Sequence, residues 1–390
     1  MSISPSPETL DVIKRLIALD TTSRDSNLEL IGQVSDALAA HGIEPVLIHN
    51  EDGRKANLLA TFPAADGSTT GGIVLSAHTD VVPVDGQQWQ SDPFTATVRD
   101  DRLYGRGTCD MKSFLGAVVA YFPAFAAAQL REPIHIAFSY DEEVGCVGAV
   151  SLVERITELG LEPRGCIVGE PSSMRAIRGH KSVNVFSVDF RGVAAHSSLT
   201  TEGVNAIAYA ARFTSFVHEL AAEFAENGPF DPAYLVPYTS TTVNQIAGGI
   251  AVNTIPADCQ LHFEFRSIAA TDQQALIERF RAKAEELNQQ MREANEQAGV
   301  EFTVVASSPG LETDADSRIV SDTAAWGALP CEDKVTYGTE AGLFANAGIA
   351  TVVCGPGDIA QAHAPDEFIE LEQIAHCEQM LDAMLADLSL

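Results

Sequence analysis

Basic side chains are scarce in this sequence of 390 residues. Lysine and arginine together number 24 against 54 aspartates and glutamates, which gives a formal net charge of −30 at pH 7. A field of that sign repels phosphate backbones and anionic lipids, so the composition argues against nucleic acids and membrane surfaces as partners. The acidic residues are dispersed along the chain rather than gathered in a tail. They therefore predict a solvated acidic surface and leave carboxylates to spare for a metal site.

Long hydrophobic runs and clustered cysteines are also missing. No apolar run approaches the roughly 18 residues that a membrane-spanning helix needs. The start, Met1-Ser-Ile-Ser-Pro-Ser-Pro-Glu8, has neither a basic nor an apolar segment, so we expect no secretory signal. The 7 cysteines include no Cys-x-x-Cys motif. Such an odd, scattered set predicts reduced thiols and a cytoplasmic location.

Three common enzyme motifs are absent or incomplete. Gly105-Arg-Gly107 lacks the third glycine of a dinucleotide-binding loop, because Asp110 occupies its place. Gly179-His-Lys-Ser182 is not a Walker A phosphate loop, since His180 replaces the glycine before the lysine. No Gly-x-Ser-x-Gly sequence occurs, so a serine hydrolase has no support.

The composition is otherwise that of a globular protein, with 46% hydrophobic and 20% charged residues. At about 150 residues per domain, the length predicts two domains or three. Apolar runs that indicate buried strands are Asn57–Phe62, Ile73–Ala77, Ile134–Tyr140, Cys166–Gly169 and Thr351–Cys354. Helical stretches that alternate with them include Phe114–Gln129, Val147–Leu159 and Leu371–Leu388, and two more precede Gly42. This alternation predicts an α/β fold with a largely parallel mixed sheet flanked by helices.

The middle of the chain follows a different pattern. The predicted order of strand, helix, strand, strand, helix and strand falls on Ser182–Arg191, Asn205–Phe224, Thr239–Ala247, Thr254–Arg266, Thr271–Ala298 and Val300–Ala306. This order is typical of a ferredoxin-like α+β module. We therefore predict one α/β domain, residues 1–180 plus 308–390, interrupted by an inserted domain at residues 181–307.

Residues able to bind a metal follow the predicted strands. They are His78, Asp80, Glu142, Glu143, Glu170 and His363. In an open α/β sheet, ligands bind at the carboxyl ends of the strands, so these loops are expected to converge. A further acid, Asp110, leads into the helical stretch that begins near residue 114. Two histidines with several carboxylates suit Zn²⁺, Co²⁺ or Mn²⁺.

Six stretches together carry a resemblance to a known family. They are Ser76-Ala-His-Thr-Asp-Val-Val-Pro83, Trp89 through Pro93-Phe94, Leu103-Tyr-Gly-Arg-Gly-Thr-Cys-Asp-Met-Lys112, Asp141-Glu-Glu143, Gly169-Glu-Pro171 and His363-Ala-Pro-Asp-Glu367. In this order, and over almost the whole chain, they resemble the M20 family of di-zinc amidohydrolases. The resemblance implies that the α/β domain is catalytic and that the inserted domain serves as a dimerisation and lid domain.

The resemblance also implies a metal centre of two zinc ions per chain, for which cobalt could substitute. Asp110 would bridge the two ions through its two oxygens. His78 and Glu170 would complete one site, and Glu143 and His363 the other. The family further suggests a cis peptide bond between Asp110 and Met111, which the sequence itself does not determine.

Three residues would serve catalysis by the same resemblance. Glu142 would be the general base, which takes a proton from the attacking water and delivers it to the departing amine. Asp80, two residues after His78, would hold that imidazole as a hydrogen-bond acceptor. His196 would enter the site from the partner subunit of a homodimer and stabilise the oxyanion.

A second set of residues would bind the substrate. Arg266 matches the family's clamp for the substrate carboxylate, a role that suits a planar guanidinium. Asn253 and the turn Gly338-Thr339-Glu340 match positions that line the pocket. Glu340 stands where a small polar residue is usual. An anion there would favour a substrate with a cationic tail, such as the δ-ammonium group of ornithine.

The branch of the family that the chain resembles most removes the acetyl group from N2-acetyl-L-ornithine, giving L-ornithine and acetate in arginine biosynthesis. Desuccinylation of succinyl-diaminopimelate, hydrolysis of another acyl amino acid and cleavage of a dipeptide remain alternatives within the family. A non-catalytic interaction or metal-storage module is disfavoured, because such a chain should have lost Glu142 or a ligand. We expect a cytoplasmic homodimer that acts on a small N-acyl amino acid.

Overall fold

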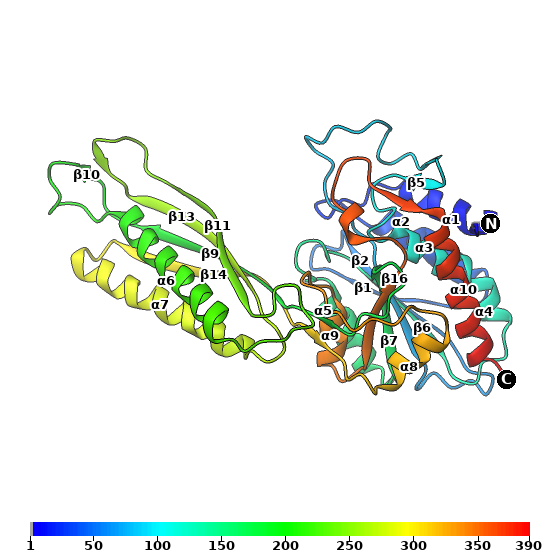
Figure 1. Ribbon diagram of the computed structural model, residues 1–390. Coiled ribbons are helices and arrows are strands. Elements are labelled where there is room, and N and C mark those ends of the chain that lie inside the picture. The colour runs from blue at the N-terminus through cyan, green and yellow to red at the C-terminus, as the bar shows by residue number, and fades with distance from the viewer. Residues whose placement is uncertain (1–2) are drawn as a thin grey trace. The chain divides into compact units, whose positions relative to one another are not determined.

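The computed structural model describes residues 3–390 (Figure 1). Residues 1 and 2 lie outside the described part. They belong to the N-terminal stretch in which we expect no secretory signal. The chain forms two compact units. The first unit comprises the chain up to Gly179, Leu311–Lys334 and Thr339–Leu390, and the inserted unit comprises His180–Gly310 and Val335–Gly338. No helix among residues 3–390 has the length and apolar character needed to cross a membrane.

A six-stranded sheet forms the centre of the first unit, in the order β1-β2-β6-β3-β7-β16. Its strands are β1 (Val46–His49), β2 (Ala56–Phe62), β3 (Ile73–His78), β6 (Ile134–Ser139), β7 (Gly165–Pro171) and β16 (Thr351–Gly355). The pairs β6–β3, β3–β7 and β7–β16 are parallel, whereas β1–β2 and β2–β6 are antiparallel. The predicted largely parallel mixed sheet is confirmed. The edge strand β1 was not predicted, because its apolar run is only three residues long, Val46–Ile48, and none of its residues is fully buried.

Helices cover both faces of this sheet (Figure 1). The helices of the first unit are α1 (Pro7–Ile17), α2 (Leu28–Ala39), α3 (Lys112–Ala120), α4 (Phe122–Ala127), α5 (Ala149–Glu158), α8 (Arg318–Ala325), α9 (Ala341–Asn346) and α10 (Leu371–Leu388), with a short 3-10 helix, η1 (Ile359–Gln361). Alternate residues of β3, Ile73, Leu75 and Ala77, enter the core that α2, α3, α4 and α10 share. The helices α5 and α9 pack against the other face. Every residue of β3 and β6 is therefore buried, which explains why both strands are predominantly apolar.

Local signals set the ends of several helices. Ser6 caps α1 by accepting a hydrogen bond from the backbone N–H of Thr9, and Pro7 is the first residue of the helix. The single helix predicted at Phe114–Gln129 is wrong, because the chain forms α3 and α4 with a break at Tyr121. Pro123 accounts for the break, since proline has no backbone N–H and fits only the first turn of a helix.

A small three-stranded sheet in the first unit was not predicted. It has the order β17-β5-β4 and consists of β4 (Thr97–Arg99), β5 (Arg102–Tyr104) and β17 (Phe368–Glu370). β5 and β17 are antiparallel, with Tyr104 opposite Phe368. This pairing brings two loops of the resemblance motifs together, because one follows β5 and the other precedes β17.

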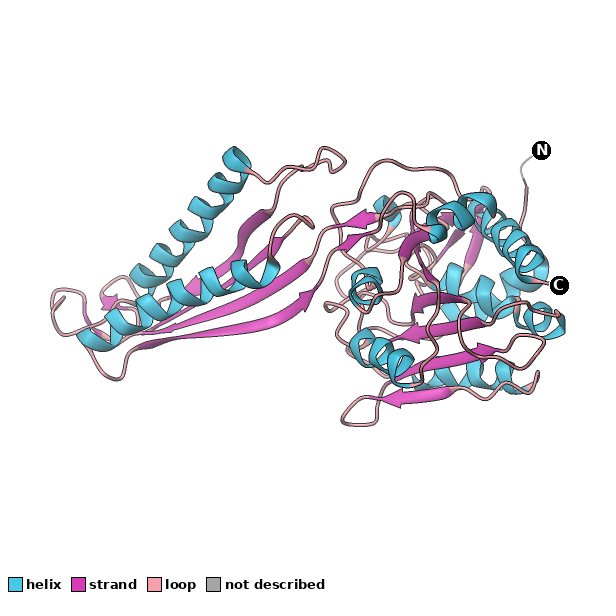
Figure 2. Cartoon of the chain, turned by 90° about the horizontal axis from the view of Figure 1, so that it is seen from below, coloured by secondary structure: helices cyan, strands magenta, loops and turns pink. Residues whose placement is uncertain are grey.

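The inserted unit is a four-stranded antiparallel sheet with two helices on one face (Figure 2). Its order is β11-β13-β9-β14. The elements are β9 (Val183–Arg191), β10 (Ala195–His196), α6 (Ala206–Asn227), β11 (Ser240–Gly248), β12 (Thr254–Ile255), β13 (Asp258–Arg266), α7 (Gln273–Ala294) and β14 (Gly299–Ser308). The short strands β8 (Gly179–His180) and β15 (Leu311–Glu312) pair with each other.

Phenylalanine rings fill the core of the inserted unit. Phe263 stacks on Phe186 at 4.8 Å between ring centroids and contacts Phe280 of α7 at 4.7 Å. Phe213 of α6 meets Phe263 edge to face at 5.4 Å. The predicted ferredoxin-like order of elements is confirmed. One expected strand, Thr254–Arg266, is instead β12 and β13, because Pro256 lies between them and has no N–H to donate to a sheet.

Candidate metal centre

The carboxyl ends of the parallel strands gather the predicted ligands at one edge of the sheet. His78 ends β3, Glu170 lies near the end of β7, and Glu143 follows β6. His363 lies in the loop after β16, with φ = 61°. Because these strands run parallel and neighbour one another, their ends meet at a single place. The convergence expected from the sequence is therefore present in the structure.

Asp110 lies between two groups of candidate ligands. Its Oδ1 atom is 3.0 Å from His78 Nε2, and its Oδ2 atom is 3.1 Å from His363 Nε2. Among the described residues, His78, Asp110 and Glu170 form one group that could hold a metal ion, and Asp110, Glu143 and His363 form the other. The peptide bond between Asp110 and Met111 is cis. One carboxylate thus offers an oxygen to each group, as a bridging ligand must.

The spacing of the donor atoms fits metal ions. His78 Nε2 lies 3.6 Å from Glu170 Oε1, and His363 Nε2 lies 3.1 Å from Glu143 Oε2. Ligand atoms placed about 2.0–2.1 Å from one tetrahedral ion lie about 3.3 Å apart. The Oε1 atom of Glu143 is also buried and has no hydrogen-bond partner within residues 3–390. Two imidazoles and three carboxylates so arranged suit zinc or cobalt.

Electrostatics also favour a cation among these groups. Burial, reinforced by the charge of Asp110, raises the pKa of Glu143 to about 7 and that of Glu170 well above its usual range. Burial alone would lower the pKa of His78, but the charges of Glu170 and Asp110 outweigh it and raise that pKa well above its usual range. A divalent cation favours the ionised carboxylates and the neutral imidazole. Metal binding would therefore release protons from the cluster.

Glu142 lies beside the cluster but belongs to neither ligand group. Its Oε1 atom accepts a hydrogen bond of 3.2 Å from the thiol of Cys146. Burial, reinforced by the charge of Glu143, raises the pKa of the Glu142 carboxyl to about 8. A carboxylate whose pKa lies near neutral pH suits a group that both accepts and returns a proton.

The predicted role of Asp80 needs a correction. His78 Nδ1 lies 2.9 Å from the backbone oxygen of Asp80 and 3.6 Å from its carboxylate. The backbone carbonyl, not the carboxylate, is therefore the acceptor that orients the imidazole. The carboxylate instead accepts hydrogen bonds from the backbone N–H groups of Glu142 and Glu143 and from the Ser23 hydroxyl.

The expectation that Glu340 faces the substrate is wrong. Its side chain is fully buried, and its two oxygens accept hydrogen bonds from Ser76 Oγ at 2.6 Å and Ser139 Oγ at 2.5 Å. Glu340 precedes α9, which packs on the sheet, so its carboxylate points to the strands. Thr339 is 1% exposed, and its hydroxyl accepts a hydrogen bond from Ala341. Neither side chain offers an accessible polar atom to a ligand in this structure.

The remaining predicted residues lie in the inserted unit. His196 is exposed on β10, and its Nδ1 atom is 2.8 Å from Ser198 Oγ. Asn253 is its neighbour, because its backbone oxygen accepts a hydrogen bond from Ser197 at 2.9 Å. Arg266 ends β13 and pairs with Glu264 at 3.3 Å. β12 adjoins the start of β13, so about eight residues at 3.3 Å each, roughly 26 Å, separate Arg266 from the His196 end. Gly338 also belongs to the inserted unit.

One ion pair near the cluster was missed by the sequence reasoning. Lys55 Nζ donates to Asp141 Oδ1 and to the backbone oxygen of Ser23. Both side chains of the pair are largely buried, and Asp141 has φ = 56° directly before Glu142. The pair anchors the loop that carries Glu142. The only signal in the sequence was the place of Asp141 next to two acids, because nothing in the chain links it to Lys55.

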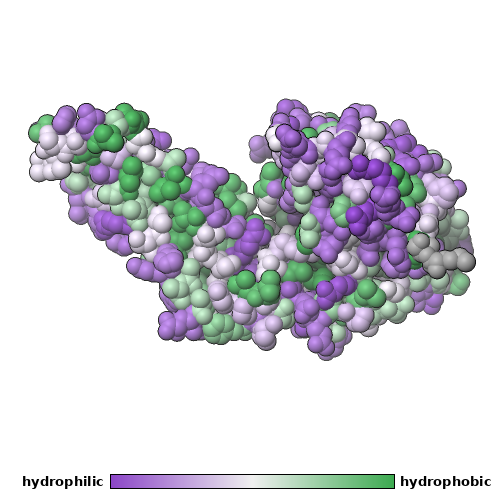
Figure 3. Space-filling view, turned by 45° about the horizontal axis from the view of Figure 1, so that its top comes forward, coloured by the Kyte–Doolittle hydropathy of each residue, from purple (hydrophilic) through white to green (hydrophobic). Residues whose placement is uncertain are grey.

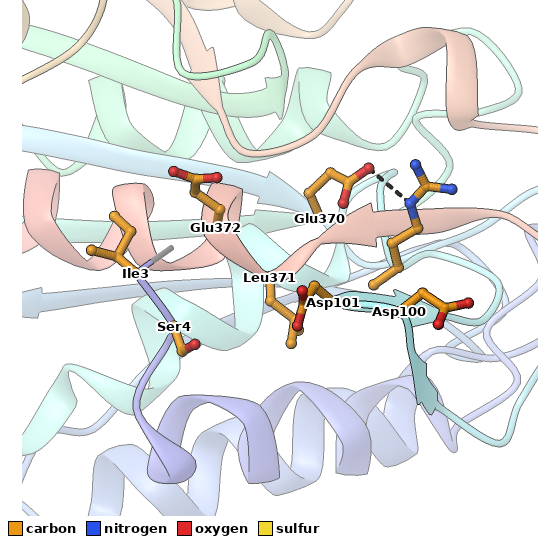
Figure 4. A pocket seen from close by; sticks show the side chains of 8 residues that line it. Ile3, Ser4, Asp100, Asp101, Glu370, Leu371 and Glu372 are labelled. Carbon is orange, nitrogen blue, oxygen red and sulfur yellow. Dashed lines mark hydrogen bonds and ion pairs between the residues drawn. The ribbon is translucent and has the colours of Figure 1, made fainter. Parts of the chain in front are cut away.

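A separate surface pocket of about 460 Å³ lies elsewhere on the first unit (Figure 4). Its lining includes the acids Asp100, Asp101, Glu370 and Glu372. Arg102 donates to Glu370 at 2.8 Å and offsets part of that charge. None of the described residues that line it is a predicted site residue, so this pocket is not part of the metal centre.

Comparison with known families and sequences gives a consistent result. The model of peptidase family M20/M25/M40 matches residues 74–387. The chain is 33% identical over 389 residues to an acetylornithine deacetylase of Pasteurella multocida (strain Pm70), and the match covers 97% of each protein. It is also 33% identical over 384 residues to an acetylornithine deacetylase of Myxococcus xanthus, with 97% of each covered.

Solved structures share the fold at lower sequence identity. Aminopeptidase PepT from Bacillus cereus ATCC 10987 superposes with a TM-score of 0.73 at 20% identity and 99% coverage of both chains. An M20 family metallo-carboxypeptidase, Sso-CP2 from Sulfolobus solfataricus, gives a TM-score of 0.73 at 18% identity, covering 98% of this chain and 100% of the other. At these identities the likeness establishes the fold.

Proposed function

Since this chain belongs to peptidase family M20/M25/M40 and is a metal-dependent amidohydrolase, we propose that it hydrolyses N2-acetyl-L-ornithine to L-ornithine and acetate, a step of arginine biosynthesis. The observation that carries the proposal is the full-length match to acetylornithine deacetylases together with the two-group ligand cluster around Asp110. The odd number of scattered cysteines supports a cytoplasmic location.

The residues of the cluster would hold two zinc ions, with cobalt as a substitute. His78 and Glu170 would bind one ion, Glu143 and His363 would bind the other, and Asp110 would bind both. When bound, a pair of divalent cations lowers the pKa of a water molecule and polarises the acyl carbonyl.

The protein's own residues would then perform the proton transfers. Glu142 would take a proton from the attacking water and deliver it to the α-amine of ornithine as the C–N bond breaks, which leaves acetate. Asp80 would keep Glu142 in place, because its carboxylate holds the backbone N–H of that residue. Arg266 would bind the substrate carboxylate, and His196 would donate a hydrogen bond to the acyl oxygen. Asn253 and Gly338 would contribute to the substrate pocket, whereas the buried side chain of Thr339 would not.

A homodimer formed through the inserted unit would supply His196. Within one chain, His196 and Arg266 lie at opposite ends of β13, so a second copy is the natural source of one of them. β11 pairs only with β13 among the described strands and is an edge of its sheet. Ile246 on this strand is 53% exposed, and Ile250 and Val252 just beyond it are almost fully exposed. Hydrophobic residues are visible on the face of the inserted unit in Figure 3.

The substrate is best tested with a panel. The zinc-loaded and cobalt-loaded protein would be assayed with acetylornithine, succinyl-diaminopimelate, acetylmethionine and a dipeptide. We expect the highest kcat/KM for acetylornithine. A higher kcat/KM for another compound of the panel would show that this compound, and not acetylornithine, is the preferred substrate. The buried position of Glu340 removes the residue on which a preference for a cationic tail was based, so this comparison decides specificity.

A further inference from the structure

A hydrogen-bond network of three side chains connects the loops that carry Asp110 and His363. Its members, Gln87, Arg106 and Glu367, lie in or beside the stretches that carry the family resemblance, yet none has a part in the proposed reaction. Gln87 lies in the loop before Trp89. Its Nε2 atom donates a hydrogen bond of 2.9 Å to the backbone oxygen of His363.

The orientation of the Gln87 amide is determined by its other partners. Its Oε1 atom accepts hydrogen bonds from an Arg106 NH2 group at 2.7 Å and from the indole N–H of Trp89 at 3.0 Å. Arginine and tryptophan side chains are donors only, so the oxygen of the amide must face them. The amide nitrogen must then face His363. The same two side chains stack, with the Arg106 guanidinium carbon 5.1 Å from the centre of a Trp89 ring.

Arg106 links Gln87 to the loop of Asp110, because it also contacts Glu367. The two side chains form an ion pair of 2.5 Å and are each 1% exposed. The Glu367 carboxylate also accepts hydrogen bonds from the backbone N–H groups of Gly107, Cys109 and Asp110, at 3.1, 2.8 and 3.1 Å. Since Glu367 lies four residues after His363, its carboxylate ties the backbone of Asp110 to the segment that carries His363.

His363 needs such support more than the other candidate ligands do. Its side chain is 53% exposed, whereas those of Glu143 and Asp110 are 7% and 6% exposed. It lies in a loop with φ = 61°, a conformation that is uncommon for non-glycine residues. The Gln87 amide is the contact that holds the carbonyl of this residue.

We infer that Gln87 is a positioning residue for the metal site formed by Asp110, Glu143 and His363, and that the buried Arg106–Glu367 pair orients it. The inference rests on the proposed two-metal centre. It predicts a selective effect, because the His78 and Glu170 site has no contact with Gln87. Removal of the amide should weaken the binding of one of the two ions and leave the binding of the other unchanged.

The test uses zinc-loaded full-length protein equilibrated against graded concentrations of a chelator, with bound zinc counted by elemental analysis. In Gln87→Ala, we expect one ion to be lost at about tenfold lower chelator concentration, at the low end of the effect known for residues that orient metal ligands. The other ion should be lost as in the wild type. Gln87→Glu keeps an acceptor for Arg106 but removes the N–H that reaches His363, so it should behave like Gln87→Ala. Gln88→Ala, at the exposed neighbour, is the matched control and should retain both ions.

A double-mutant cycle separates positioning from a general loss of structure. In a His363→Ala background, the further change Gln87→Ala should leave zinc retention unchanged, because the ligand that Gln87 orients is already gone. Equal retention by Gln87→Ala and wild type, equal weakening of both ions, or an additive effect in the cycle would overturn the inference. If the protein binds two ions but hydrolyses no acetylornithine, the proposed substrate fails while this inference stands.

Discussion

The carboxylate of Asp80 accepts a hydrogen bond of 3.1 Å from the backbone N–H of Glu142. Asp80 follows β3 and Glu142 follows β6, so this contact joins the ends of two neighbouring strands. The second carboxylate oxygen accepts from the N–H of Glu143 at 3.3 Å and from Ser23 Oγ at 2.6 Å. One buried acid thus holds the backbone of both the proposed base and a proposed ligand.

Replacing Asp80 by alanine should lower kcat. The change leaves the N–H groups of Glu142 and Glu143 without their acceptor, so the proposed base loses its fixed position. Residues that orient metal ligands typically contribute about 10–100-fold to metal affinity or activity, and we expect kcat to fall by a factor in that range. The measurement is kcat on acetylornithine. Asp85→Ala, which alters an exposed acid of the same loop, is the control. A kcat within twofold of wild type in Asp80→Ala would contradict this role.

The isosteric change Glu142→Gln should abolish most of the activity while zinc stays bound. Glutamine cannot accept and return a proton, and a general base typically contributes about 10²–10⁴-fold. Bound zinc should remain at the wild-type level, because Glu142 belongs to neither ligand group. The adjacent change Glu143→Gln should instead weaken one ion. Activity near wild type in Glu142→Gln would show that another group is the base.

Substitution of Glu340 should affect all substrates alike. The side chain has no exposed surface and bonds only inside the sheet, with Ser76 and Ser139. Glu340→Gln should therefore change kcat/KM for acetylornithine and for acetylmethionine by the same factor. Glu340→Ala leaves the buried Ser139 hydroxyl without its acceptor, whereas Ser76 Oγ can still donate to the backbone oxygen of Ala137 at 3.1 Å. The change should therefore lower the free energy of unfolding by about 1–3 kcal/mol. A loss of kcat/KM confined to acetylornithine would instead indicate that Glu340 contacts the cationic tail of the substrate directly.

The stability of the protein should fall on acidification partly because of His180. Burial lowers the pKa of this histidine from 6.5 to about 4. The unfolded chain therefore binds a proton that the folded chain does not between these two values. The contribution is fully present above pH 6.5 and is lost as the pH falls toward 4, by up to about 3 kcal/mol.

The matched variants for this effect are His180→Gln and His218→Gln. Urea unfolding would be followed from pH 8 to pH 4.5. The first variant should show a shallower loss of stability with falling pH, whereas the exposed His218 should leave the wild-type slope. Identical pH slopes for His180→Gln and wild type would exclude the buried histidine as a cause.

Much of the first unit could be predicted because its strands are buried on both faces. β3 and β6 are predominantly apolar over their length, and such stretches are visible in a sequence without any knowledge of partners. Elements with mixed exposure escaped prediction, among them β1 and the small sheet β17-β5-β4. Their residues show neither a long apolar run nor strict alternation, and only their neighbours in space make them strands.

The proposed metal centre could likewise be predicted only in part from the sequence. The sequence places His78, Glu143 and Glu170 at strand ends, and parallel strand ends must meet. It contains no sign of which atoms hold those ligands. The use of the Asp80 backbone oxygen for His78 depends on the path of the chain after β3. The contact of Gln87 with His363 joins residues 276 positions apart.

The sequence by itself determined the family, the α/β architecture and the set of side chains able to bind metal, because these depend on residue types and on their order along the chain. Only the tertiary structure decided the direction and surroundings of individual carboxylates. It turned Glu340 into the sheet and set Asp80 against the loop of Glu142. It also enclosed Glu367 with Arg106. A buried carboxylate needs hydrogen-bond donors, and the donors of these three come from strands and loops that only folding brings together.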